Sequence, residues 1–129
     1  PDKVIWFHTE DRKVHPREGI LRLLAKGISL DAVVCYNDQI AMQIIPALAS
    51  RGIRVPEDIS VTGYDNSYMA MGDGFRLTTI VHPQEKLGEM AAQLLLSLLQ
   101  GEILQPEERK ILIQPELVVG NSCHTTAPK

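Results

Sequence analysis

The stretch that decides the fold runs from residue 31 to residue 65 and reads DAVVCYNDQIAMQIIPALASRGIRVPEDISVTGYD. Its first run, Ala32–Tyr36, is apolar almost throughout, which is expected of a strand covered on both faces. Apolar residues then recur three and four positions apart from Asp38 to Ser50, a spacing that predicts an amphipathic helix. A second strand-like run follows at Ile59–Tyr64. A strand, a helix and a strand in this order predict parallel strands joined by a right-handed crossover.

The same alternation extends outward on both sides of this stretch. The preceding helix is expected to begin at Pro16, which suits a first turn, and to end at Gly27. A later helix is expected over Pro83–Gly101, and Met69–Arg76 is expected to be a loop or a turn of helix. Further strands are expected at Val4–Phe7, Leu77–Val81, Ile111–Ile113 and Leu117–Val119. The whole pattern predicts an α/β fold, a three-layer doubly wound parallel sheet.

The helix predicted at Pro83–Gly101 is apolar on more than one side. Its main stripe, with helical spacing, holds Leu87, Met90, Ala91, Leu94, Leu95 and Leu98. Leu96 and Leu99 lie off that stripe. A helix with a second apolar side needs a second surface to pack against, so we expect it to find a partner such as a symmetric neighbour.

The composition excludes several classes of protein. The chain has 129 residues, 44% of them hydrophobic and 22% charged, and its formal net charge is −3. These values fit one globular domain and argue against a disordered tail. An acidic chain is also poorly suited to neutralise nucleic-acid phosphates by itself. No apolar run approaches the ~20 residues of a membrane-spanning helix, so no membrane contact is expected.

Cysteine and histidine usage argues against metal and disulfide sites. Cys35 and Cys123 lack metal-ligand spacing, and Cys35 fits a buried strand position, so a reducing, cytoplasmic setting is expected. The four histidines include no pair with i, i+4 spacing on a helix. The sequence has no nucleophile motif and no phosphate loop, so we expect no enzyme, no metal and no cofactor. Because the chain opens at Pro1 without a signal-type stretch, we expect a piece of a longer protein.

Polar side chains follow two of the predicted strands where each strand ends. Asn37 and Asp38 follow the first strand, and Asp65 and Asn66 follow the second. Ligands of doubly wound sheets bind at this edge, and short amides and carboxylates match the hydrogen bonds of a polyol. Either cluster alone is better explained by helix capping, which contributes ~1 kcal/mol. The two together favour a ligand site, with Asn37 and Asp65 facing one shared hollow.

Four motifs occur in order along the chain. An Asn-Asp pair with Ala41 is followed by GIRVPEDISV and then by Gly-Tyr-Asp, which ends at Asp65. LTTIVHPQEKLGEMAAQLLL comes next, and ILIQPELVVGNSC ends the series. Together they resemble the C-terminal lobe of the lactose/galactose-repressor family of sugar sensors, over roughly residues 17 to 123. The resemblance implies one lobe of a periplasmic-binding-protein-like (type I) sensor domain.

The resemblance also implies sugar-binding roles for particular residues. The asparagine of the Asn-Asp motif carries over to Asn37, and the aspartate of Gly-Tyr-Asp carries over to Asp65. His82 lies at the crossover between lobes, where relatives that bind pentoses place a polar ligand, and Gln84 follows on the same segment. By its position alone, His82 is either a turn residue or a site residue.

Two ligands expected from the family are missing. Its arginine ligand lies upstream of this chain, and no aromatic residue stands near Val14 to stack on the sugar. The closing stretch, ILIQPELVVGNSC, is most similar to arabinose-responsive members. The implied effector is therefore a small sugar, with L-arabinose expected.

By the same resemblance, residues 1–129 form part of an effector-binding domain, the C-terminal lobe with its crossover helix at 83–101. The N-terminal lobe and the DNA-binding domain would lie outside it, so operator DNA would be contacted only through that domain. The implied protein is a cytoplasmic repressor that closes on its sugar and releases DNA. We expect a homodimer that pairs through the helix from Asp38 and the Tyr68–Phe75 loop. The alternatives are a periplasmic sugar-binding protein that serves a transporter and an enzyme of the doubly wound class.

Overall fold

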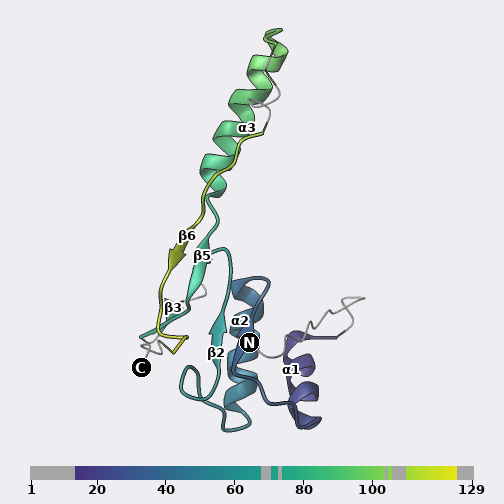
Figure 1. The fold of residues 1–129 in the computed structure, drawn as a ribbon, viewed down its shortest axis with the longest axis vertical. Coiled ribbons are helices and arrows are strands. Elements are labelled where there is room, and N and C mark those ends of the chain that lie inside the picture. Colours follow the sequence, from purple (N-terminus) through teal and green to yellow (C-terminus); the bar gives the residue numbers. More distant parts are fainter. Residues whose placement is uncertain (1–13, 68–70, 73, 104, 106–109, 125–129) are drawn as a thin grey trace.

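The computed structural model describes residues 14–67, 71–72, 74–103, 105 and 110–124. Along these residues, helices and short strands alternate (Figure 1). The helices are α1 (Pro16–Ala25), α2 (Asp38–Ala49) and α3 (Gln84–Leu99). The strands are β1 (Ala32–Val34), β2 (Ser60–Thr62), β3 (Met71–Gly72), β4 (Phe75–Arg76), β5 (Thr79–Val81) and β6 (Glu116–Val118). The strand expected at Val4–Phe7 lies outside the described residues.

The central sheet is built on β1 and β2, which run parallel with Val33 opposite Val61. A parallel bridge between Thr62 and Thr78 places β5 beside β2. Strand β6 then pairs antiparallel with β5. The order across the sheet is therefore β1, β2, β5, β6. Because the strands on either side of α2 are parallel neighbours, the parallel pairing predicted for them from the sequence is confirmed.

The core lies between one face of this sheet and the helices α1 and α2, which pack against each other (Figure 1). The apolar spacing of α2 directs Ala41, Ile44 and Leu48 inward, where all three are buried. The buried apolar residues of the core are Ile20, Cys35, Ala41, Ile44, Ala47, Leu48, Ile59, Val61 and Leu77. Burial of each large aliphatic side chain stabilises the fold by about 1.5–3 kcal/mol. This packing fixes the sheet edge at which β1, β2 and β5 end.

The opposite face of the sheet is open. Side chains alternate along β1, so Val33 and Cys35 pack into the core while Val34 and Tyr36 point away. Val34 is 84% exposed and Tyr36 is 86% exposed. Leu117 on β6 is exposed as well. The described residues therefore form two of the three predicted layers, the sheet and one layer of helices.

Helix α3 projects away from the sheet (Figure 1), and none of its residues is buried. Leu95 and Leu96 are both more than half exposed, and Leu99 is 75% exposed. The second apolar side predicted for this helix is thus present, and no segment of the described chain covers it.

Two local predictions are wrong. Ile111–Ile113 forms no strand, because the short β5 pairs along its whole length with β6 and leaves the preceding residues without a partner. The loop expected near residue 70 contains a hairpin instead, in which Met71–Gly72 pairs antiparallel with Phe75–Arg76. Gly74 supplies the positive φ of 81° that this tight turn uses.

Candidate functional site

The loops that follow β1, β2 and β5 meet at one edge of the sheet. Asp38 N–H donates to Tyr64 O at 2.9 Å, which joins the loop after β1 to the loop after β2. Asp65 N–H donates to Ile80 O at 2.9 Å, which joins the second loop to β5. The loops that carry the predicted site residues therefore lie at the edge where doubly wound sheets bind ligands.

Asn37 is the N-cap of α2. Its backbone is extended, and its Oδ1 accepts a hydrogen bond from Ile40 N–H at 2.9 Å. The capping role considered from the sequence is thus present. The amide nitrogen of Asn37 makes no hydrogen bond within the described part of the chain. The side chain therefore holds the helix through its oxygen and keeps two N–H donors for a ligand.

Asp65 and Asn66 form a turn with left-handed backbone. Their φ angles are 96° and 51°. Side chains other than glycine adopt this region at a cost of roughly 1–2 kcal/mol, and Asp and Asn tolerate it best. The Asp65 side chain remains 37% exposed. A costly backbone turn thus presents an accessible carboxylate at the sheet edge.

His82 lies beside Asp65. The distance from His82 Nδ1 to Asp65 Oδ1 is 4.0 Å, and both side chains are partly exposed. The Tyr64 ring meets the imidazole edge to face, with centroids 5.7 Å apart and planes at 81°. The structure therefore brings two predicted site residues together and adds Tyr64, which sequence reasoning did not single out. The signal for Tyr64 was its place inside the Gly-Tyr-Asp motif.

Gln84 is the first residue of α3 and is exposed. Its backbone N–H donates to His82 O at 2.8 Å. In the described segments, no hydrogen bond joins its side chain to Asn37, Asp65 or His82. The hydrogen bond between Gln84 and the predicted site residues is therefore one between backbone groups only.

Asp38 has a role that sequence reasoning missed. Its side chain is fully buried, although it follows Asn37 at the start of α2. Asp38 Oδ1 accepts from the Thr79 hydroxyl at 2.6 Å, and Oδ2 accepts from Ser67 N–H at 2.7 Å. The carboxylate of Asp38 therefore accepts hydrogen bonds from β5 and from the loop after β2. No local sequence signal marks hydrogen bonds between residues so far apart in the chain.

The carboxylate of Asp38 also affects a neighbouring thiol. Burial and, as the smaller effect, the nearby negative charge of Asp38 together raise the pKa of Cys35 to about 12. Cys35 is therefore a protonated, unreactive thiol at neutral pH, which agrees with its expected buried position.

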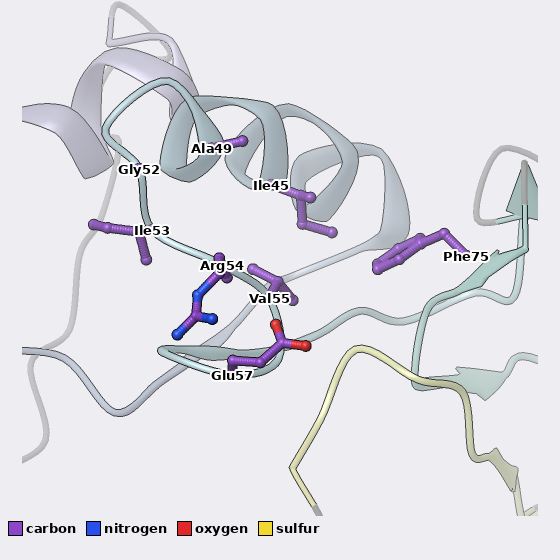
Figure 2. A pocket seen from close by; sticks show the side chains of 8 residues that line it. All are labelled: Ile45, Ala49, Gly52, Ile53, Arg54, Val55, Glu57 and Phe75. Atoms are coloured by element: carbon purple, nitrogen blue, oxygen red, sulfur yellow. The ribbon is translucent and has the colours of Figure 1, made fainter.

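The described surface includes the following two hollows. One, of about 210 Å³, lies on the open face of the sheet over Val34, Tyr36 and Tyr64. The other, of about 410 Å³, lies between α2 and the turn after it (Figure 2). In Figure 2, Ile45 and Phe75 approach this second hollow from opposite sides. Asn37, Asp65 and His82 line neither of the two, so the shared hollow expected at the site is not one of them.

Two other expectations concern metals and membranes. In the segments that the structure describes, no group of three or more His, Cys, Asp or Glu side chains is placed to hold a metal ion. No helix of the described residues combines the length and the apolar character that crossing a bilayer requires.

Residues 3–123 match the family described as a periplasmic binding protein-like domain. An arabinose metabolism transcriptional repressor from Halalkalibacterium halodurans is 34% identical over 126 residues, which are 95% of this chain and 34% of that protein. A repressor of the same name from Geobacillus stearothermophilus is 36% identical over 118 residues, which are 90% of this chain and 32% of that protein. The chain thus spans about a third of the length of these curated relatives.

Solved structures share the fold. The transcriptional regulator CelR in complex with cellobiose matches with a TM-score of 0.73 at 30% identity, over 83% of this chain and 32% of that one. The lac repressor dimer bound to operator and the anti-inducer ONPF matches with a TM-score of 0.73 at 31% identity, over 84% of this chain and 37% of that one.

Proposed function

This chain belongs to the periplasmic binding protein-like domain family and is an effector-binding region of the LacI/GalR repressor type, and on that basis we propose that its sheet edge binds a sugar. The fold is the type I periplasmic-binding-protein-like α/β fold, of which this chain is a part. The proposed ligands are Asn37, Asp65 and His82, with Gln84 as a fourth candidate on the crossover segment.

The observation that carries the proposal is the Asp65–His82 pair at the sheet edge. His82 Nδ1 and Asp65 Oδ1 lie 4.0 Å apart, and both side chains reach solvent. Asp65 accepts hydrogen bonds from sugar hydroxyls, and hydrogen bonds to a charged group contribute about 1.5–3 kcal/mol each. The unused amide donors of Asn37 supply the complementary contacts. The Tyr64 ring beside His82 adds an aromatic surface of the kind that the sequence lacks near Val14.

We propose L-arabinose as the effector. Two relatives that align with at least nine tenths of this chain are named arabinose metabolism repressors, which supports that sugar as the first to be tested. CelR, one of the matching structures in complex with a sugar, holds cellobiose, so the fold itself does not select among sugars. Selection must come from the polar side chains at the edge and from groups on the opposing lobe.

The remainder of the site belongs to a second lobe in this proposal. The chain spans about a third of its curated relatives, and α3 has no buried residue. We propose that residues 1–129 are the C-terminal lobe with its crossover helix, and that α3 packs on an N-terminal lobe. Sugar held between the lobes favours the closed arrangement only to the extent that it binds that arrangement more tightly.

Pairing of two copies and contact with DNA complete the proposal. Repressors of this kind need a dimer because operator half-sites are arranged with two-fold symmetry. We propose that two copies meet through α2 and the β3–β4 hairpin, the elements that flank the apolar hollow in Figure 2. Because the chain itself carries a net charge of −3, we propose that operator DNA is bound by a domain outside this chain. The whole repressor would act in the cytoplasm.

The test is the substitution Asp65→Asn in the full-length protein. Asparagine tolerates the left-handed backbone of residue 65, so this change removes the charge and keeps the turn. Calorimetric titration with L-arabinose should show affinity reduced by about tenfold or more, while operator binding without sugar stays as in the wild type. Asp31→Ala, at an exposed aspartate, is the matched control and should change neither property. Unchanged arabinose affinity in Asp65→Asn would show that the site is assigned wrongly.

A further inference from the structure

Asp38 joins the segments that carry the proposed sugar ligands. Its fully buried carboxylate accepts from the Thr79 hydroxyl at 2.6 Å and from Ser67 N–H at 2.7 Å. Thr79 lies on β5 three residues before His82, and Ser67 lies two residues after Asp65. One carboxylate at the start of α2 therefore fixes both neighbouring segments relative to α2.

The turn at residues 65–67 is held by hydrogen bonds from three successive backbone N–H groups. Asp65 N–H donates to Ile80 O at 2.9 Å, and Ser67 N–H donates to Asp38. Between them, Asn66 N–H donates to Thr79 Oγ1 at 3.4 Å. Because the turn has left-handed backbone at two non-glycine residues, it persists only where its surroundings hold it.

The Thr79 hydroxyl connects these bonds. It donates its hydrogen to Asp38 Oδ1 and accepts from Asn66 N–H. The carboxylate thus orients the hydroxyl so that its lone pair faces the turn. Loss of the hydroxyl removes one anchor of the turn and one donor to the buried charge.

We propose that Asp38, acting through Thr79, is a positioning residue of the sugar site. It does not touch the sugar, because it is fully buried. It holds the turn that presents Asp65 and fixes that turn relative to the strand that leads to His82. The inference rests on the proposed function, because Asp65 and His82 are the ligands it positions.

Stability alone does not account for a buried carboxylate at this place. Desolvation of the charge offsets much of what its hydrogen bonds gain, and a well-packed apolar residue often serves as well. The N-terminus of α2 offsets part of this cost, because its helix dipole favours a negative charge. What only the carboxylate supplies is two acceptors that face two different segments.

The variant Thr79→Val tests the proposal in the full-length protein. Valine keeps the β-branched shape and removes the hydroxyl. We expect the Kd for L-arabinose, measured by calorimetry, to rise about tenfold or more at unchanged binding stoichiometry. The variant Thr79→Ser keeps the hydroxyl, so its Kd should lie within about threefold of that of the wild type. Thr62→Val makes the same change on β2, at a threonine with no side-chain hydrogen bond in the described chain, and should leave the Kd unaltered.

A merely structural role gives a different result. It lowers the melting temperature and the fraction of competent sites, while the Kd of the folded molecules stays as in the wild type. That result overturns the proposal, as does equal loss of affinity in Thr79→Ser and Thr79→Val.

A second variant tests the strained turn itself. Glycine adopts positive φ without steric cost, so Asn66→Gly should restore part of the affinity when combined with Thr79→Val. A double variant that binds L-arabinose no better than Thr79→Val contradicts the idea that Thr79 holds this turn.

Amide hydrogen exchange separates this proposal from the proposed function. Wild-type protein that binds no L-arabinose contradicts the proposed sugar. The exchange of the Asp65 and Ser67 amides then decides the positioning role without any ligand. Thr79→Val should accelerate both by about tenfold, while the amides at the centre of α2 keep their rates. Equal rates in wild type and variant overturn it.

Discussion

Asp38 and Gly63 share one space in the fold. A Cβ on Gly63 would overlap Asp38 Oδ1 and crowd Leu77. Gly63 is not among the residues with positive φ, so close approach rather than backbone freedom requires glycine here. The Asn-Asp and Gly-Tyr-Asp motifs, read from the sequence as two separate ligand clusters, are therefore also two halves of one packing arrangement.

Gly63→Ala should destabilise the protein by about 1–3 kcal/mol, because the added methyl group must displace a buried carboxylate. Urea unfolding followed by circular dichroism measures the change. Gly88→Ala is the matched control, since a Cβ there meets nothing within 4 Å and the residue lies inside α3. Alanine favours a helix by about 0.5–1 kcal/mol over glycine, so this control should not lose stability. Equal stability of the two variants would contradict the packing assigned to Asp38.

The capping and binding roles of Asn37 can be separated. Serine caps a helix about as well as asparagine but has no amide donors. Asn37→Ser should therefore keep the thermal stability of the wild type and lose affinity for L-arabinose in calorimetry. Asn37→Ala should lose the cap as well and be less stable by about 1 kcal/mol. A serine variant that binds as tightly as the wild type would leave Asn37 as a cap alone.

Cys35 should make stability depend on alkaline pH. Its pKa is about 12 in the folded protein against the ordinary value of 9.0, so the unfolded chain loses this proton first as pH rises. The contribution of the protonated Cys35 thiol to the free energy of unfolding is fully present below pH 9. Between pH 9 and pH 12 it declines by up to about 1.4 kcal/mol per pH unit. Urea unfolding of wild type and Cys35→Ser at pH 8, 9 and 10 measures the difference in slope. Identical slopes would contradict the elevated pKa.

The exposed leucines of α3 should drive self-association of the isolated 129-residue chain. Leu95 and Leu99 are both more than half exposed and one turn apart. Sedimentation velocity should show concentration-dependent association that Leu95→Gln with Leu99→Gln weakens, because apolar area leaves the contact. A wild-type chain that stays monomeric at high concentration would contradict this. Leu117→Gln on the open sheet face is the control, and a monomer produced by that change alone would move the contact to the sheet.

The sequence predicted the helices and the parallel crossover well, because these follow from local spacing. Apolar residues three and four apart mark α2, and Pro16 and Gly27 bracket α1 closely. The strand predicted at Ile111–Ile113 is absent because β-branched residues form a strand only where a neighbouring strand is long enough to pair with them.

The candidate site could be predicted only at the level of its edge. Asn37, Asp65 and His82 each follow an extended run, and parallel strands end at a common edge. The bond between Asp38 and Thr79 was beyond reach, because it joins residues 41 positions apart and leaves no periodic trace. The role of Tyr64 is not predictable from the sequence for a similar reason, since its contact with His82 depends on how β2 and β5 align.

Helix α3 begins two residues after His82 and extends about 24 Å from that point, at 1.5 Å per residue. If the helix moves as a rigid rod, it pivots at its first turn, beside a proposed ligand residue. A rotation of a few degrees at the imidazole moves the far end of the helix by ångströms. A partner that binds the far end of α3 can therefore change the position of His82 by a small amount, enough to make or break a contact with one sugar hydroxyl.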